Sequence, residues 1–181
     1  KALEISITER GTESSSKPEL ILVQAITKSD RNKEMLELIT AAGVDQVIPW
    51  QAERSISKWQ DDSKRKWLIT IKESCKQSRR VKVPRLRQVM NTTSLAKEFN
   101  SKNLGLVFHE SGQVKFADAQ FDSNLDAVYL IIGPEGGITD NELSIFQGAG
   151  SMILRLGPTV LRSAHAGFAA LAAVQTKLGR W

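Results

Sequence analysis

The chain has 181 residues, of which 41% are hydrophobic and 25% charged, and it carries a single cysteine and a formal net charge of +5. This composition predicts one sizeable core, excludes an internal disulfide and a cysteine-based metal site, and favours a polyanionic partner such as nucleic acid without requiring one. No apolar run approaches the roughly 20 residues of a membrane helix, and the first residues do not resemble a signal peptide, so we expect a cytoplasmic protein that contacts no membrane.

Strand-like and helix-like segments alternate along the chain. Apolar or extended runs predict strands at 19–25, 46–50, 81–86, 104–109, 127–132 and 151–156. Apolar residues at helical spacing and hydroxyl caps predict helices at 33–42, about 57–77, 92–100, after 139, and about 160–178. Because the strands are almost continuously apolar, this order predicts an α/β fold in which helices cover both faces of a mostly parallel sheet.

Two segments fit this pattern less well. Residues 1–18 read as one strand followed by a polar linker, which suggests the end of a preceding N-terminal domain. Residues 110–126 are rich in Asp and Gln and predict a loose connection between two strands.

The segment LIIGPEGGITDNEL, residues 130–143, changes abruptly from an apolar strand to a helix start. Its glycines permit positive φ and a close approach to the backbone, and Pro134 stiffens the turn. Thr139 and Glu142 have the spacing of a capping box, so the helix start is strongly specified. Ligands collect at the carboxyl ends of parallel strands, but the local residues leave a ligand site and a purely structural turn as alternatives.

The composition of this corner limits the kind of ligand. The dinucleotide and Walker motifs are absent, and Glu135 would repel a phosphate. A carboxylate beside exposed backbone groups suits a ligand with hydroxyls, amines or positive charge. A second Gly-Pro corner follows the next strand in LRLGPTVLR, residues 154–162, so the two corners are predicted to form two walls of one pocket.

A set of segments, in the order LVQAITKSDR, AAGVDQVIPWQAERS, ESCKQSRRVKVP, IIGPEGGITDNE and LGPTVLR, resembles the RsmE family of ribosomal RNA methyltransferases. This family belongs to the SPOUT superfamily, and the resemblance covers nearly the whole chain from about Glu19. It implies a sheet with a deep C-terminal trefoil knot, and an enzyme that transfers a methyl group from S-adenosylmethionine to N3 of a uridine in 16S ribosomal RNA of the small subunit. Residues 19–181 would form the SPOUT domain, and residues 1–18 would be the remnant of, or linker from, an N-terminal barrel-like RNA-binding domain.

The resemblance also assigns the cofactor site to three segments at strand ends. The implied contacts are Phe108, His109, Glu110, Ile132, Gly133, Pro134, Glu135, Gly136, Gly137, Leu154, Leu156, Gly157, Pro158, Val160 and Leu161. Backbone groups do much of the recognition in such proteins, which accounts for the glycines in these segments.

Methylation of uridine N3 requires removal of a proton or stabilisation of the anion that develops on the ring. Arg162 is the first candidate for stabilising the uracil oxygens, because arginine stays protonated and offers fixed donors. The alternative is that Arg162 pairs with Glu135 or a neighbouring acid and braces the loop.

The segment around Arg162 departs from the pattern of many relatives. They carry Arg, Glu and Thr where this chain has Thr159, Ala164 and His165. A mechanism that uses that glutamate as a base is therefore in doubt here. We expect His165 to be a bystander, and His109 to line the cofactor site rather than transfer protons.

Basic residues concentrate in one quarter of the chain. The segment KQSRRVKVPRLR has little acid to balance it, which favours contact with RNA phosphates, whereas Lys64–Lys66 lie near acids and are expected to be a solvated helix face. The predicted RNA contacts are Arg54, Arg79, Arg80, Lys82, Arg85 and Arg87.

The expected partners are 16S ribosomal RNA or the small ribosomal subunit, and a second copy of the chain, since SPOUT sites are usually completed in a homodimer. The final helix carries Phe168, Leu171, Ala172, Gln175 and Leu178 at helical spacing. We expect it to pack both on its own sheet and on a partner. Two alternatives to the rRNA enzyme stay open: a non-catalytic RNA-binding or ribosome-assembly module of the same fold, and a SPOUT methyltransferase that acts on transfer RNA.

Overall fold

The computed structural model describes residues 3–11, 16–122 and 124–181. In chain order the elements are β1 (Glu19–Ala25), α1 (Ser29–Ala41), β2 (Gln46–Trp50), α2 (Ser63–Gln77), β3 (Arg85–Leu86), α3 (Thr92–Ala96), β4 (Asn103–Phe108), β5 (Val114–Lys115), a 3₁₀ turn η1 (Phe116–Asp118), β6 (Ala127–Ile132), α4 (Asp140–Gly148), β7 (Met152–Arg155) and α5 (Ser163–Lys177). No helix in these described ranges is long and apolar enough to cross a membrane.

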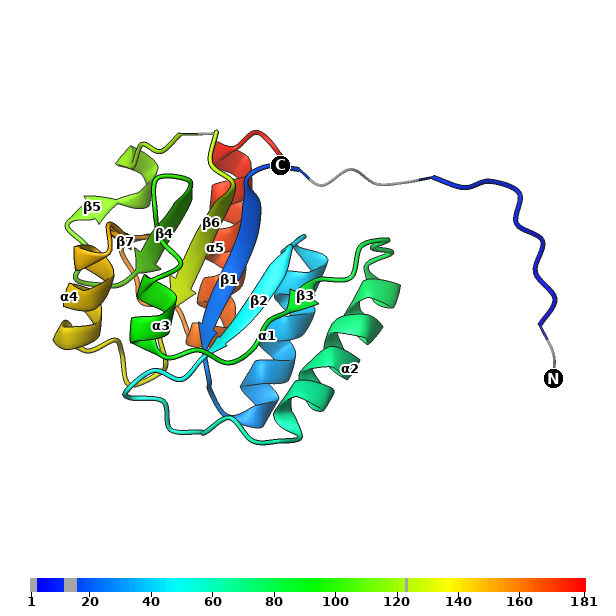
Figure 1. The fold of residues 1–181 in the computed structure, drawn as a ribbon, viewed down its shortest axis with the longest axis horizontal. Helices are drawn as coiled ribbons and strands as arrows, with labels where there is room; N and C mark the ends of the chain where they lie inside the picture. The colour runs from blue at the N-terminus through cyan, green and yellow to red at the C-terminus, as the bar shows by residue number, and fades with distance from the viewer. Residues whose placement is uncertain (1–2, 12–15, 123) are drawn as a thin grey trace.

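The strands form one seven-stranded sheet in the order β3-β2-β1-β6-β4-β7-β5 (Figure 1). Every paired strand runs parallel to its neighbour, which confirms the predicted parallel sheet. The last residue of β6, Ile132, stands level with Gln24 on β1 and Phe108 on β4, so the carboxyl ends of the central strands meet at one edge.

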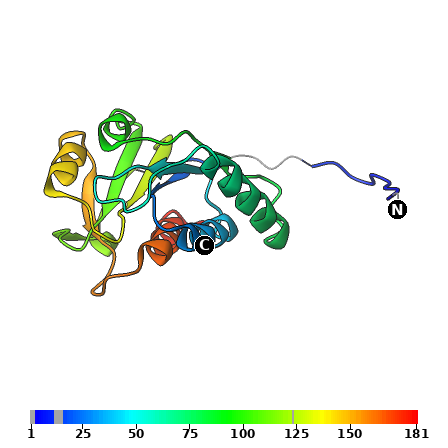
Figure 2. The ribbon, with the colours of Figure 1, turned by 90° about the horizontal axis from the view of Figure 1, so that it is seen from below.

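Helices cover both faces of the sheet, and the alternation of side chains along β1 shows how. Leu20 and Leu22 point into a core shared with α1, α2 and α5. Ile21 and Val23 point into a second core, shared with α3 and α4. Figure 2 shows α3 and α4 on one side of the sheet and α1 and α5 on the other. Burial on both sides accounts for strands that read as continuous apolar runs.

Four details differ from the sequence-based expectation. Helix α2 begins at Ser63 instead of about 57, and the extended segment 81–86 contributes only the two residues of β3. The loose connection 110–126 contains β5 and η1. The strand expected within residues 1–18 is wrong for residues 3–11, which pair with no other strand among the described residues; residues 12–15 of the expected linker lie outside the described part.

Helix α5 packs on its own sheet, as predicted; the second predicted contact, with a partner chain, stays a prediction. It lies against α1, β1 and β6, and it buries Gly167, Ala170, Leu171 and Val174. A Cβ on Gly167 would come within 3.2 Å of Leu22, so the absence of a side chain there lets the helix approach β1 closely.

Candidate active site

A cavity of about 790 Å³ opens at the carboxyl ends of the central strands. Three loops form its walls: the one that follows β4, the GPEGG corner between β6 and α4, and the LGPTVLR corner between β7 and α5. The two Gly-Pro corners therefore line one pocket, as predicted, although β4 lies between their strands in the sheet.

Every residue that the sequence suggested for the cofactor site lines this cavity, apart from Leu154. The side chain of Leu154 is fully buried in the core, and the exposed neighbour that lines the cavity is Arg155. Successive residues of a strand point to opposite faces, so the two cannot both face the cavity. Leu154 still supports the site, because its carbonyl accepts a hydrogen bond from the amide of His109 at 2.9 Å.

Further lining residues were not predicted as contacts of the cofactor. They are Arg31, Arg54, Ile138, Asp140, Arg155, Thr159, Arg162, Ser163 and Ala166. Arg54 and Arg162 were expected to meet RNA. Arg31 follows β1 and belongs to the segment LVQAITKSDR, so its presence in a shared motif was the available signal.

The GPEGG corner is held by packing and by backbone hydrogen bonds. A Cβ on Gly133 would lie 2.7 Å from Cγ1 of Ile138, so any other residue there would displace Ile138. Gly137 adopts a φ of 76°, and its amide donates to the carbonyl of Pro134 at 2.9 Å. Thr139 then caps α4 in the predicted capping box.

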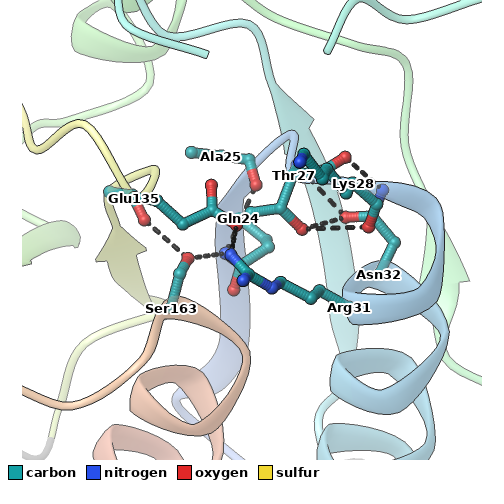
Figure 3. A network of polar contacts seen from close by, with 9 residues as sticks. Gln24, Ala25, Thr27, Lys28, Arg31, Asn32, Glu135 and Ser163 are labelled. Carbon is teal, nitrogen blue, oxygen red and sulfur yellow. Dashed lines mark hydrogen bonds and ion pairs between the residues drawn. The ribbon is translucent and has the colours of Figure 1, made fainter. Parts of the chain in front are cut away.

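Side chains from other elements tie this corner to the rest of the site (Figure 3). The hydroxyl of Ser163 donates to the carbonyl of Gly133 at 2.6 Å and accepts from Nε2 of Gln24 at 2.8 Å. Arg31 pairs with the carboxylate of Glu135 at 2.5 Å. The corner is therefore fixed to β1, α1 and the start of α5.

The start of α1, which carries Arg31, is held by its own local network, also drawn in Figure 3. Oδ1 of Asn32 accepts from the hydroxyl of Thr27 at 2.8 Å, and Nδ2 of Asn32 donates to the carbonyl of Thr27 at 2.9 Å. Both side chains are buried. This turn places Arg31 in the cavity lining.

The LGPTVLR corner is far more open. Residues 158–162 are exposed, with 76% of Val160 accessible. Within the described residues, the amides of Gly157, Thr159, Val160 and Leu161 donate no hydrogen bond to another protein group. Unpaired amides and carbonyls of this kind are what a ligand with hydrogen-bonding edges can use.

Arg162 stands just before the first turn of α5 and lines the cavity. The alternative that it pairs with Glu135 is not seen, because Glu135 pairs with Arg31. Arg162 is exposed at the cavity wall, where its guanidinium can reach a substrate.

The two histidines have different surroundings. Nδ1 of His109 accepts from the amide of Ser111 at 3.2 Å, so a neutral His109 carries its proton on Nε2. The contact of His165 lies elsewhere, since its Nε2 is 2.9 Å from the carboxylate of Glu34 on α1. His165 is absent from the cavity lining, and neighbouring Ala164 is buried.

The predicted RNA contacts separate into two groups. Arg54, Arg79 and Arg85 are exposed; of these, Arg54 lines the cavity and donates one hydrogen bond, to the carbonyl of Gly136. The other three have partners within the protein: Arg80 donates to two carbonyls, of Thr40 and Val44, Lys82 pairs with Asp45, and Arg87 pairs with Glu98. Acids from other elements, Asp45 and Glu98, therefore balance part of this basic segment, which its own sequence does not show.

Arg87 belongs to a half-buried cluster beside β6. Burial lowers the pKa of Arg87, but hydrogen bonds to Glu98 and Tyr129 outweigh it, so the pKa stands above its ordinary value. Burial and the nearby charge of Glu98 raise the pKa of Tyr129. This cluster stabilises the fold and is not part of the cavity lining. In the described part of the chain, no group of His, Cys, Asp and Glu residues could hold a metal ion.

Comparisons with known proteins agree with this geometry. Residues 14–175 match the profile of the RNA methyltransferase domain family. The ribosomal RNA small subunit methyltransferase E of Mycobacterium tuberculosis is 35% identical over 173 residues, which cover 91% of this chain and 66% of that protein. The chain thus spans just under two thirds of that relative's length.

Two solved structures share the fold. The ribosomal RNA small subunit methyltransferase E of Neisseria gonorrhoeae, bound to S-adenosyl methionine, matches with a TM-score of 0.83 at 29% identity, over 93% of this chain and 70% of that one. A proposed methyltransferase of Legionella pneumophila, in complex with the bound cofactor SAM, matches with a TM-score of 0.79 at 32% identity, over 88% and 66%. These likenesses confirm the SPOUT-type α/β fold class, while the trefoil knot stays a prediction. The chain therefore belongs to the RNA methyltransferase domain family, with the ribosomal RNA small subunit methyltransferase E proteins among its relatives.

Proposed function

We propose that this chain uses S-adenosylmethionine to methylate N3 of a uridine in 16S ribosomal RNA. The observation that carries the proposal is the cavity itself, because its walls are the three strand-end loops that the resemblance assigned to the cofactor. Membership of the family and the names of the relatives support the reaction and the substrate.

The residues present fit such a cofactor. A volume of about 790 Å³ lies within the range of roughly 300–1,000 Å³ that small-molecule sites occupy. The open amides of the LGPTVLR corner would meet the adenosine, and a Cβ on Gly136 would come within 3.1 Å of Arg54, so that wall has no spare room. The lining carries acids, Glu110, Glu135 and Asp140, beside the arginines Arg31, Arg54, Arg155 and Arg162. It therefore offers partners both for a cationic group of the cofactor and for an anionic RNA.

When bound, S-adenosylmethionine supplies an electrophilic methyl group. Arg162 would stabilise the uracil oxygens while negative charge develops on the ring, because its guanidinium stays charged and carries fixed donors. We assign no carboxylate base, since Ala164 occupies the position where many relatives carry Glu. Holding the uracil ring in line with the methyl group of the cofactor would supply much of the remaining rate acceleration.

RNA contact is proposed for the exposed arginines Arg54, Arg79 and Arg85, which would neutralise phosphates. A homodimer, a SPOUT domain at 19–181 and a linker at 1–18 are proposed from the resemblance alone. Arg80, Lys82 and Arg87 are not included among the proposed contacts, because the protein itself occupies their side chains.

The first test is calorimetric titration with S-adenosylmethionine. Gly136→Arg should abolish binding, because even a Cβ at Gly136 crowds Arg54 and the longer side chain would fill the cavity. Gly148→Arg is the matched control, since a Cβ at this helical glycine meets nothing within 4 Å. Binding that survives Gly136→Arg, or is lost equally in the control, would count against the proposed site.

The second test follows the methyl group into RNA. The chain is incubated with labelled S-adenosylmethionine and either naked 16S RNA, small subunits or transfer RNA, and the modified nucleosides are identified by mass spectrometry. We expect N3-methyluridine in 16S RNA and a large loss of kcat in Arg162→Ala. Label in transfer RNA would favour the tRNA enzyme, and cofactor binding with no transfer to any RNA would favour a non-catalytic module.

A further inference from the structure

One buried carboxylate lies at the junction of three loops. The side chain of Glu142, in the first turn of α4, is almost fully buried. Its Oε1 accepts from the amide of Glu53 at 2.9 Å and from the hydroxyl of Thr92 at 2.8 Å. Its Oε2 accepts from the amide of Thr139 at 3.2 Å. Only the last contact belongs to the capping box of α4, so a cap alone does not account for the other two.

The donors around Glu142 require a carboxylate. Two backbone amides, those of Glu53 and Thr139, point at different oxygens of the same side chain. A glutamine would place its NH₂ group against one of these amides in either orientation, which leaves a buried donor without an acceptor. The carboxylate of Glu142 therefore joins the loop after β2 to the loop after β6.

The contacts around Glu142 reinforce this junction. The hydroxyl of Thr139 donates to the carboxylate of Glu53 at 2.9 Å. The indole of Trp50, the last residue of β2, donates to the hydroxyl of Thr92 at 3.1 Å. The chain is therefore anchored at Trp50 and again at Glu53, immediately before Arg54.

Arg54 directly follows the anchored Glu53 and lies in the cavity lining. Its Nη1 donates to the carbonyl of Gly136 at 3.2 Å, and its Cβ packs against the same glycine. Arg54 is otherwise exposed and lines the cavity beside the GPEGG corner. Glu142 and Arg54 lie 88 positions apart in the chain, and no sequence pattern connects them.

We propose that Glu142 is a positioning residue that holds Arg54 at the cavity wall, where Arg54 contacts a phosphate of the RNA substrate. This inference rests on the proposed function. Glu142 touches neither cofactor nor RNA; it acts through the Glu53 amide and the turn that follows.

A double-mutant cycle on the full chain tests the proposal. Glu142→Gln, Arg54→Ala and the double variant are assayed for two quantities, the Michaelis constant for the ribosomal RNA substrate and the Kd for S-adenosylmethionine. We expect either single variant to raise the RNA KM about tenfold, as loss of one well-placed phosphate contact would, and the double variant to be no worse than Arg54→Ala. The cofactor Kd should change less than about twofold in Glu142→Gln.

Asp45→Asn is the control, because Asp45 is a partly buried carboxylate that also accepts a backbone amide, that of Leu20, away from the cavity lining. It should lower stability without raising the RNA KM, since losing its pairing with Lys82 removes no positive charge from the surface. Additive effects of Glu142→Gln and Arg54→Ala, or an equal rise of KM in the control, would overturn the positioning role.

Hydrogen exchange at the Glu53 amide separates this proposal from the proposed function, since it needs no RNA. Faster exchange is expected at this amide or at that of Thr139 in Glu142→Gln, whose single amide oxygen can serve only one of them, and at both amides in Glu142→Leu. Unchanged exchange at the Glu53 amide in Glu142→Leu would overturn the anchor itself. If exchange is faster but no RNA is bound or methylated by the unmodified chain, the proposed function and the RNA contact of Arg54 both fail, while the anchor stands.

Discussion

Gly133 and Gly157 both precede a proline at the end of a parallel strand, yet the protein surrounds them differently. A Cβ on Gly133 would collide with Ile138, and the carbonyl of Gly133 accepts from Ser163. A Cβ on Gly157 would meet nothing within 4 Å. Similar sequence corners thus give one wall that is packed and hydrogen-bonded and one that is open.

This difference suggests how the two walls share the work of binding. The GPEGG corner is held by the protein before any ligand arrives, so little ordering cost remains there. The LGPTVLR corner keeps its amides unpaired among the described residues, and a ligand would have to order it. We therefore expect ligand binding to change the second corner much more than the first.

The largest expected effect is on hydrogen exchange when S-adenosylmethionine is added. The amides of Val160 and Leu161 should slow by up to about 100-fold at a cofactor concentration of about 100 times Kd, which corresponds to about 2.7 kcal/mol. The amide of Gly137 already donates to Pro134 and should change little. Exchange is read by mass spectrometry or NMR with and without cofactor. Equal slowing at both corners would break the comparison.

The next effect concerns stability without a ligand. Gly133→Ala should lower the free energy of unfolding by about 1–3 kcal/mol, the usual cost of overpacking, because the new Cβ would lie 2.7 Å from Ile138. Gly157→Ala should stay within about 0.5 kcal/mol of the parent chain, since the space is open and the φ of Gly157 is not positive. Urea unfolding measures both, and equal losses would show that the corners are not held differently.

Much of this arrangement follows from sequence. The continuous apolar runs of β1 and β6 predict a parallel sheet, and a parallel sheet predicts that its strand-end loops meet. The capping box at Thr139 is a local pattern, and the structure confirms it. The resemblance to a known family adds the expectation that these loops hold a cofactor.

What sequence could not supply comes from contacts between distant residues. Asp45 and Glu98 balance Lys82 and Arg87, although the basic segment itself has few acids. Strand β5 has only two residues, and its Val114 is exposed, so no alternation marks it. The sequence also did not show which way each side chain at the end of β7 points. Leu154 points into the core, whereas its neighbour Arg155 lines the cavity.

The smallest expected effect is that of the Arg31–Glu135 ion pair, which joins α1 to the packed corner. The two side chains are 47% and 23% exposed, so solvent screens their attraction. A double-mutant cycle with Arg31→Ala and Glu135→Ala, read by urea unfolding, should give a coupling of about 0.2–1 kcal/mol that shrinks as salt is added. A coupling of this size would mean that packing at Gly133 and the Ser163 hydrogen bond hold the corner, with the ion pair serving mainly to keep Glu135 paired in the cavity lining. A larger, salt-insensitive coupling would instead make Arg31 one of the main supports of this wall, and the contrast with the open corner would then depend on charge as much as on packing.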